Sequence, residues 1–347
     1  MDDGHQTQGA ARTVHVHIGM HKTGSTSIQA TFGSYDDGRI AYLQLPQRNH
    51  SLFVATMFMA RPEAHKSNRG RSASALARAR VDLRARAQKQ FDGNRKDFIL
   101  SGEYFSMGFQ PGDIADLKAF LAPHFDRIHV IVYVRDPFSY MRSQIQQKAK
   151  NDRFAFNMEA AFPLYSERLG PWFDAFPAED VDIVMFDPAS FPNGDVVQDF
   201  ARRIGVDLAP GASKRANESM SAESYALRYF LRWTLQRKPL NPLKRAWARL
   251  ALPLAEGYGT ARFEVGREER LAVIARHADE VRWIEQRLGR TFPAPPESVQ
   301  GVVFRNEDDV LRYAGTLLPA FRAHCRDKLP LSVLLRDVFR PTRARSR

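Results

Sequence analysis

Short apolar segments alternate with longer amphipathic segments along the first two thirds of the chain. Val14, Val16 and Ile18 alternate with polar residues, which is the period of a β-strand. We predict strands within residues 13–18, 39–45, 97–106, 127–134 and 181–186. Between them we predict helices after residue 24 and within residues 50–60, 72–91, 138–150, 154–176 and 194–204. This alternation predicts an α/β fold with a parallel, phosphate-loop-type sheet of about five strands flanked by helices.

The last third of the chain has a helical pattern. We predict helices over residues 221–236, 242–252, 266–288 and 307–339. Residues 205–215 have the composition of a linker or long loop. We therefore divide the chain into an α/β core over residues 12–218 and a helical C-terminal extension over residues 219–347, packed on the core.

The amino-acid composition is typical of a soluble, globular protein. Hydrophobic residues make up 44% and charged residues 26% of the 347 positions, which is typical of a chain with a large buried core. The single cysteine, Cys325, excludes an internal disulfide and is best explained by helix packing. We find no signal peptide pattern and no apolar run long enough to span a membrane. These features predict a cytoplasmic location.

The chain is strongly basic. It has 51 Lys and Arg residues against 39 Asp and Glu residues, a formal net charge of +12. The electrostatic field of such a charge favours the binding of a polyanionic nucleotide, the binding of an acidic acceptor, or peripheral association with a membrane surface. The basic residues are spread over several predicted helices, and no nucleic-acid-binding motif accompanies them, so we expect no specific nucleic-acid partner.

Residues 13–29 predict a strand, a tight loop and the start of a helix. Gly19 and Gly24 bracket the loop, and small hydroxyl residues follow where they can cap the helix N-terminus. Such a joint directs backbone N–H groups and the positive end of a helix dipole at an anion. The usual phosphate loop places its lysine after the second glycine, followed by a hydroxyl residue for magnesium, whereas here Lys22 precedes Gly24. A polar turn that only caps the helix is the alternative.

The loop resembles the 5'-phosphosulfate loop of the sulfotransferases that use 3'-phosphoadenosine 5'-phosphosulfate (PAPS). That loop has the form K-x-G-[ST]-[ST], and residues 22–26 match it. The family's 3'-phosphate element has an arginine at the end of a strand and a serine eight positions later, and Arg135 and Ser143 have this spacing. The resemblance implies PAPS as donor, its bisphosphate PAP as product, and no metal. It implies donor binding by His21, Lys22, Thr23, Gly24, Ser25, Thr26, Arg135 and Ser143.

Glu103 follows the third predicted strand, so it should face the same crevice as Lys22 and Arg135. Members of the resembled family carry an acid/base residue near this rim. The resemblance implies that Glu103 is the general base and that Lys22 stabilises the leaving group; His21 is an alternative acid or base. A purely structural carboxylate, bonded to backbone N–H groups or to Lys22, is an equal alternative.

These observations predict a PAPS-dependent sulfotransferase that acts on a hydroxyl or amine, with a carbohydrate or related small molecule as the first acceptor class. By family analogy, Lys214 and Arg215 could close over the nucleotide. A nucleotide-dependent kinase or hydrolase is one alternative. Asp136 follows a strand, as the magnesium-binding aspartate of such enzymes does, and this favours the alternative. The position of Lys22 before Gly24 argues against it. A non-catalytic protein that binds acidic polymers is the other.

Overall fold

The computed structural model describes residues 11–149, 155–209, 211–214, 219–236, 241–330 and 332–333. They group into two compact units. The first unit contains residues up to 136, residues 164–217 and residues 282–291. The second contains residues 137–163, residues 218–281 and the chain from residue 292 onward.

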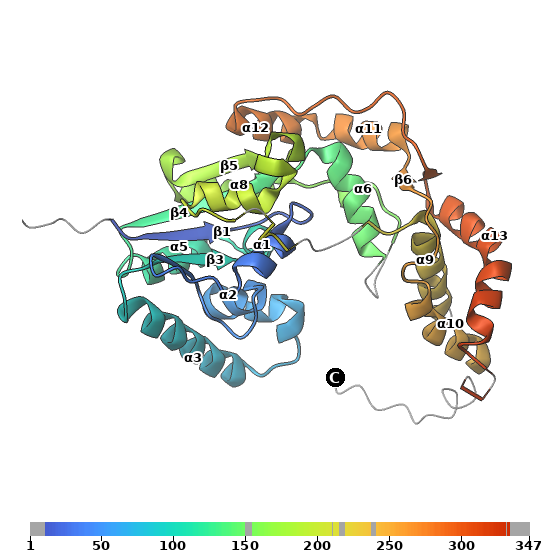
Figure 1. Cartoon of the computed structure of the whole chain (residues 1–347), viewed down its shortest axis with the longest axis horizontal. Helices are drawn as coiled ribbons and strands as arrows, with labels where there is room; N and C mark the ends of the chain where they lie inside the picture. Colours follow the sequence, from blue (N-terminus) through green and yellow to red (C-terminus); the bar gives the residue numbers. More distant parts are fainter. Residues whose placement is uncertain are drawn as a thin grey trace, which may run out of the picture. The chain divides into compact units, whose positions relative to one another are not determined.

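A five-stranded parallel sheet forms the centre of the first unit (Figure 1). Its strands are β1 (Thr13–His17), β2 (Ile40–Tyr42), β3 (Asp97–Ser101), β4 (Arg127–Val134) and β5 (Val181–Met185). Their order in the sheet is β2-β3-β1-β4-β5, which confirms the predicted α/β fold. His17 at the end of β1 pairs with Ser101 on one side and Ile131 on the other. The carboxyl ends of β1 and β3 therefore lie at one edge, and β4 continues past them toward Arg135.

Helices cover both faces of this sheet. They are α1 (Ser25–Phe32), α2 (Ser51–Phe58), α3 (Ala73–Asp92), α4 (Phe105–Gly108), α5 (Pro111–Leu121), α7 (Tyr165–Ala175) and α8 (Val196–Arg203). Phe32 of α1 and Phe200 of α8 share a core cluster with Ile99 of β3. Phe98, on the opposite face of the same strand, contacts Phe91 of α3 with ring centroids 5.1 Å apart. The sequence pattern did not predict α4 or α5.

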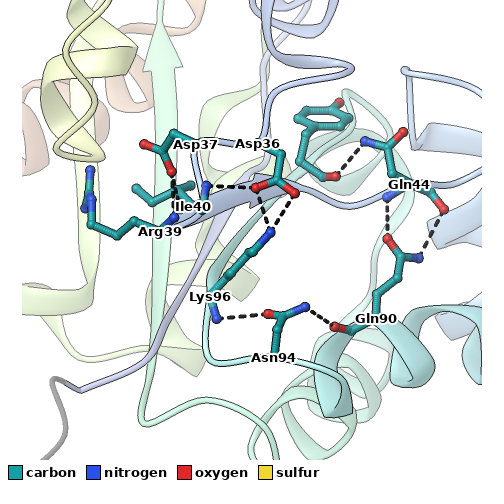
Figure 2. A network of polar contacts seen from close by, with 10 residues as sticks. Asp36, Asp37, Arg39, Ile40, Gln44, Gln90, Asn94 and Lys96 are labelled. Carbon is teal, nitrogen blue, oxygen red and sulfur yellow. Dashed lines mark hydrogen bonds and ion pairs between the residues drawn. The ribbon is translucent and has the colours of Figure 1, made fainter.

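Polar contacts join the segments on either side of the edge strand β2 to helix α3 and to the chain before β3 (Figure 2). Lys96 forms an ion pair with Asp36 at 2.7 Å, and its backbone N–H donates to Asn94 at 2.9 Å. Gln90 accepts from the backbone N–H of Gln44 at 2.8 Å. These contacts are largely exposed, so they fix the register of a three-residue strand and add little stability.

The second unit is mostly helical but contains a small sheet. Its helices are α6 (Pro137–Lys148), α9 (Ala222–Gln236), α10 (Pro242–Leu254), α11 (Arg267–Arg276) and α13 (Glu307–Arg326), and α12 (Ala278–Leu288) carries residues of both units. The strands β6 (Phe263–Val265) and β7 (Val302–Phe304) pair in parallel, a feature that the predicted helical extension did not include. Each strand has three residues, too few to show a period.

Two helix boundaries also differ from the predicted ones. The helix predicted over residues 266–288 divides at His277 into α11 and α12. The helix predicted to continue to residue 339 ends at Arg326, and the chain beyond residue 333 lies outside the described residues. Cys325 is buried in a core shared by α9, α10 and α13, in agreement with a packing role. No described helix has both the length and the apolar character to cross a membrane.

Candidate functional site

The candidate site is built on the loop between β1 and α1. The backbone N–H of Ile18 donates to Ile131 of β4 at 3.0 Å, and the N–H of Gly102 donates to His17 at 3.1 Å. These bonds extend the sheet by one residue past β1. The chain then leaves the sheet at Gly19, between the ends of two neighbouring parallel strands, which is where ligands of such sheets bind.

Two residues of the loop have a left-handed backbone. Lys22 has φ 69° and Gly24 has φ 84°. The Thr23 hydroxyl, between them, donates to the carbonyl of Met20 at 2.6 Å and so closes the turn. Turns of this kind point successive backbone N–H groups toward one side, which makes a concave anion site. Thr23 therefore shapes the loop with its buried side chain and offers its backbone to a ligand.

Helix α1 begins at Ser25 without a side-chain cap. Gly24 is the N-cap residue, and no side chain accepts a hydrogen bond from the first turn. The expectation that the hydroxyl residues cap this helix was therefore wrong. The helix is eight residues long, and the N–H of Ser27 donates to the Gly24 carbonyl at 2.9 Å. The N–H groups of Ser25 and Thr26, which precede the first intrahelical bond, are the ones that the helix start offers to a ligand.

The loop fits an anion by two further observations. A Cβ atom on Gly19 would lie 2.6 Å from the Ser25 hydroxyl oxygen, so only glycine leaves space at that position. The Ser25 hydroxyl is buried at the same point and interacts with the Glu103 carboxylate, whose pKa it lowers. An anion bound in the loop would compete with that carboxylate for the hydroxyl hydrogen bond.

Arg135 lies beside this loop, as the sequence predicted for a residue at the end of β4. Its guanidinium Nη1 donates to the carbonyl of Lys22 at 3.1 Å. The guanidinium also lies 5.6 Å from the ring centre of Phe186. The Tyr165 hydroxyl donates to the Arg135 carbonyl at 2.6 Å and fixes the backbone there. A guanidinium held in this way is oriented for bidentate binding of a phosphate.

Glu103 and His21 meet at the other side of the loop. Nδ1 of His21 lies 3.3 Å from Oε2 of Glu103, and about a quarter of each side chain is exposed (27% and 24%). Burial raises the pKa of Glu103, while the charge of Lys22 and the Ser25 hydroxyl act in the opposite direction. Burial, together with the charges of Arg168, Lys22 and Lys66, lowers the pKa of His21 to about 4. At neutral pH the imidazole is therefore uncharged, and its contact with Glu103 is not an ion pair.

Buried polar side chains lie beneath the loop. The sequence indicated Ser101 and Ser106, after the third predicted strand, as lining residues of lower rank, whereas His17 and Gln29 were not identified from it. The Ser106 hydroxyl donates to the carbonyl of Gly19 at 2.8 Å, so it holds the loop instead of lining the site. Nδ1 of His17 lies 2.8 Å from the Ser101 hydroxyl, to which Gln29 donates at 3.2 Å. In the sequence, His17 alternates with apolar neighbours, so the pattern predicted that its side chain lies on the polar face of the strand. Its ring packs against Phe200 of α8, with ring centroids 5.4 Å apart, and periodicity within β1 does not report this contact.

Thr26 follows the loop directly and is exposed on the first turn of α1. Ser143 is half-buried on α6 in the second unit. Lys214 is exposed, and its backbone N–H donates to the Thr31 hydroxyl at 3.0 Å. Arg215 lies outside the described residues. Within the described residues, no group of three or more His, Cys, Asp or Glu side chains could hold a metal ion.

Comparison with known proteins gives sequence and fold similarities. No family model matches the chain. An uncharacterized protein of Archaeoglobus fulgidus is 26% identical over 127 residues, which is 35% of this chain and 34% of the relative, so the match spans about a third of that protein.

Solved structures give longer but more distant matches. A sulfotransferase from Alicyclobacillus acidocaldarius aligns over 81% of this chain and 98% of its own, with 16% identity and a TM-score of 0.44. A sulfotransferase domain of the Synechococcus PCC 7002 olefin synthase aligns over 77% and 95%, with 14% identity and a TM-score of 0.35. A sulfotransferase domain from the curacin biosynthetic pathway aligns over 58% and 76%, with 12% identity and a TM-score of 0.34. At this level the chain is similar to these structures, and the site itself must carry any functional assignment.

Proposed function

We propose that this protein transfers a sulfuryl group from PAPS to a hydroxyl or amine of an acceptor. One observation carries the proposal: Lys22 lies in the loop before Gly24, and Arg135 at the next strand end donates to its carbonyl. The arrangement provides positive charge and backbone N–H groups without the Lys-Ser/Thr pair that holds magnesium in nucleotide hydrolases. A carbohydrate or related metabolite is the first acceptor class to screen.

The donor would be held by groups of the first unit. The loop N–H groups, the start of α1 and the Ser25 hydroxyl would bind the 5'-phosphosulfate. Arg135 would bind the 3'-phosphate through two N–H groups. The role of Ser143 in binding the same phosphate rests on the sequence motif.

The transfer step needs one base and one group that stabilises the leaving oxygen. As the acceptor oxygen attacks sulfur, the bond between sulfur and the bridging oxygen breaks, and 3',5'-adenosine bisphosphate leaves. Lys22 would neutralise the charge that develops on the bridging oxygen. The carboxylate of Glu103 would take the proton of the acceptor hydroxyl. The neutral His21, whose Nδ1 lies 3.3 Å from Oε2 of Glu103, would lie beside the carboxylate without neutralising it.

Two other functions predict different ligands. A kinase or hydrolase would bind ATP with magnesium, which the position of Lys22 does not favour. A non-catalytic protein that binds acidic polymers would use diffuse charge, and its affinity would not depend on Lys22 or Arg135.

Isothermal titration calorimetry separates the three functions. We would titrate the full chain with 3',5'-adenosine bisphosphate, ADP and ATP in buffer without magnesium. We expect the bisphosphate to bind at least tenfold more tightly than ADP or ATP, because the others lack a 3'-phosphate. Arg135→Ala should remove this preference, since it deletes the group assigned to that phosphate. Arg95→Ala is the matched control, because Arg95 is exposed in the same unit and away from the loop.

Each other result points away from the proposal. Equal or tighter binding of ATP would favour a kinase or hydrolase. An absence of nucleotide binding, with heparin affinity that survives Lys22→Ala and Arg135→Ala, would favour the polymer-binding protein. A loss of preference in Arg95→Ala as well would mean that Arg135 acts only through general charge.

A further inference from the structure

A cavity of about 330 Å³ lies entirely within the second unit. Its walls come from the start of α6, from β6 and the residue before it, from α11, and from the segment that leads into β7. Its charged lining residues are Arg142, Arg262, Arg270 and Glu264. Three arginines and one carboxylate leave two positive charges in excess, so the cavity favours an anion.

Arg270 and Glu264 form the buried wall of this cavity. Both are almost fully buried, with 1% and 2% of their surface exposed, and Nη2 of Arg270 lies 2.9 Å from Oε1 of Glu264. Arg270 also donates to the carbonyls of Val265 and Phe138, at 2.8 and 3.0 Å. Its guanidinium lies 3.6 Å from the ring centre of Phe138. Arg270 is thus committed to the fold and holds Glu264 in position.

Arg142 uses Glu264 as an anchor and still has capacity for a ligand. Its Nη1 donates to Oε2 of Glu264 at 3.0 Å, while the backbone N–H of Val265 donates to Oε1 at 3.0 Å. Both carboxylate oxygens are therefore satisfied. A guanidinium has five N–H groups, and Arg142 keeps 30% of its side chain exposed. The buried carboxylate orients this arginine before any ligand arrives.

Arg262 supplies a second cation whose guanidinium is not anchored. Its side chain is exposed and has no hydrogen bond or ion pair with another residue of the described ranges. Its backbone is fixed, because its carbonyl accepts from Val302 at 2.9 Å. A Cβ atom on Gly301 would lie 2.4 Å from that carbonyl, so the chain before β7 passes close to Arg262.

The rest of the lining is amphipathic. Pro296 and Val299 provide apolar surface, and Ser139, Ser298 and Gln300 provide polar groups. An apolar patch beside hydroxyl and amide groups suits the C–H face and the hydroxyl groups of a sugar ring. A nucleobase is less suited, because the aromatic ring of the lining already has a guanidinium against it.

We propose that this cavity binds an acidic sugar unit. Arg142 and Arg262 hold its carboxylate or sulfate ester, and the polar side chains of the lining bind its hydroxyls. The site is separate from the proposed donor loop in its residues and in its ligand. It gives the chain an affinity for acidic saccharides that does not depend on PAPS.

Calorimetry on the full chain tests the cavity with defined probes. We would titrate glucuronic acid, glucose 6-sulfate and, as the neutral control, glucose. At least one acidic sugar should bind at least tenfold more tightly than glucose. Arg262→Ala should weaken that binding at least tenfold, and the fold should be unaffected because the exposed side chain has no hydrogen bond or ion pair with another described residue. Arg326→Ala makes the same charge change on an exposed position of α13 and should leave the affinity unchanged.

No binding of either acid, equal binding of glucose, or unchanged affinity in Arg262→Ala would overturn the proposal. Equal losses in Arg262→Ala and Arg326→Ala would also overturn it, because they would indicate general charge attraction. The same preparations are titrated with 3',5'-adenosine bisphosphate. Bisphosphate binding without acid binding refutes only the cavity, and acid binding without bisphosphate binding refutes only the donor assignment.

Discussion

Lys22 has a backbone conformation that residues other than glycine rarely adopt. Its φ of 69° costs about 1–2 kcal/mol for a side chain with a Cβ atom. The hydrogen bonds from Thr23 to Met20 and from Arg135 to Lys22 hold the turn against this cost. Strain that is maintained by neighbouring contacts is frequent at functional sites. The conformation supports the proposal that this position is kept for its ammonium group.

The titration of Glu103 should depend on Lys22. We expect the pKa of Glu103 to lie above its ordinary value of 4.5, because burial disfavours the carboxylate. Lys22→Ala should raise this pKa further, since the Lys22 charge stabilises the ionised form. Difference carboxyl ¹³C NMR spectra between wild type and Glu103→Gln measure it. Lys66→Ala is the control, because Lys66 acts on the pKa of His21. A Glu103 pKa that does not move in Lys22→Ala would contradict the assigned electrostatics.

Glu103→Gln should separate binding from chemistry. The amide keeps the size of the side chain but cannot take a proton, so we expect transfer to fall about 10²–10⁴-fold. The affinity for 3',5'-adenosine bisphosphate should change less than twofold. In the wild type the rate should fall as the pH falls through the raised Glu103 pKa, because the carboxylate must be ionised. Near-normal transfer by Glu103→Gln would exclude Glu103 as the base, and His21 would be the next residue to replace.

The apolar runs and the predicted parallel topology indicated where the candidate site forms, because the carboxyl ends of neighbouring parallel strands meet at one edge of the sheet. From the end of β3 and the end of β4, the sequence placed Glu103 and Arg135 near the β1–α1 loop, and the contacts of both with this loop agree. The bond from Ser106 to Gly19 was not predictable, because it depends on the turn that follows Gly102. The three-residue strands β6 and β7 escaped prediction because they show no period, and they form a wall of the arginine-lined cavity.

The loop element tolerates only glycine at position 24. We expect Gly24→Ala to destabilise the chain by about 2–4 kcal/mol, since the new Cβ has an unfavourable φ and overlaps a neighbour. That Cβ would lie 2.5 Å from Cγ1 of Val196. Gly38→Ala is the matched control, because Gly38 has φ 88° with no atom within 4 Å of a new Cβ. It should cost only about 1 kcal/mol of backbone strain.

Urea unfolding of the two glycine variants measures the difference. Bisphosphate calorimetry should show weaker binding in Gly24→Ala alone, because only that change distorts the loop. Equal unfolding free energies in the two variants would mean that Val196 moves aside without cost.

At the scale of the whole molecule, three of the buried histidines of the first unit have a pKa far below the ordinary value. Burial lowers the pKa of His15, His17 and His50 to about 3. In the unfolded chain each titrates near 6.5. Between pH 6.5 and 3 the unfolded state therefore binds more protons, so the stability of the fold falls as the pH falls. Each histidine contributes a loss of about 1.4 kcal/mol per pH unit.

Acid should therefore unfold the first unit before the second. A loss of about 8 kcal/mol over two pH units is comparable to the total stability of a typical domain, about 5–15 kcal/mol. All three histidines lie in the first unit. Hydrogen exchange measured by mass spectrometry between pH 7 and 4, corrected for the intrinsic pH dependence of exchange, tests this prediction. Peptides of β1, β3 and α2 should lose protection at a higher pH than peptides of α9 and α13. His50→Gln should reduce the slope of unfolding free energy against pH by one proton. Parallel loss of protection in both sets of peptides would show that the units unfold as one body. An unchanged slope in His50→Gln would show that the burial of His50 does not make the fold sensitive to acid.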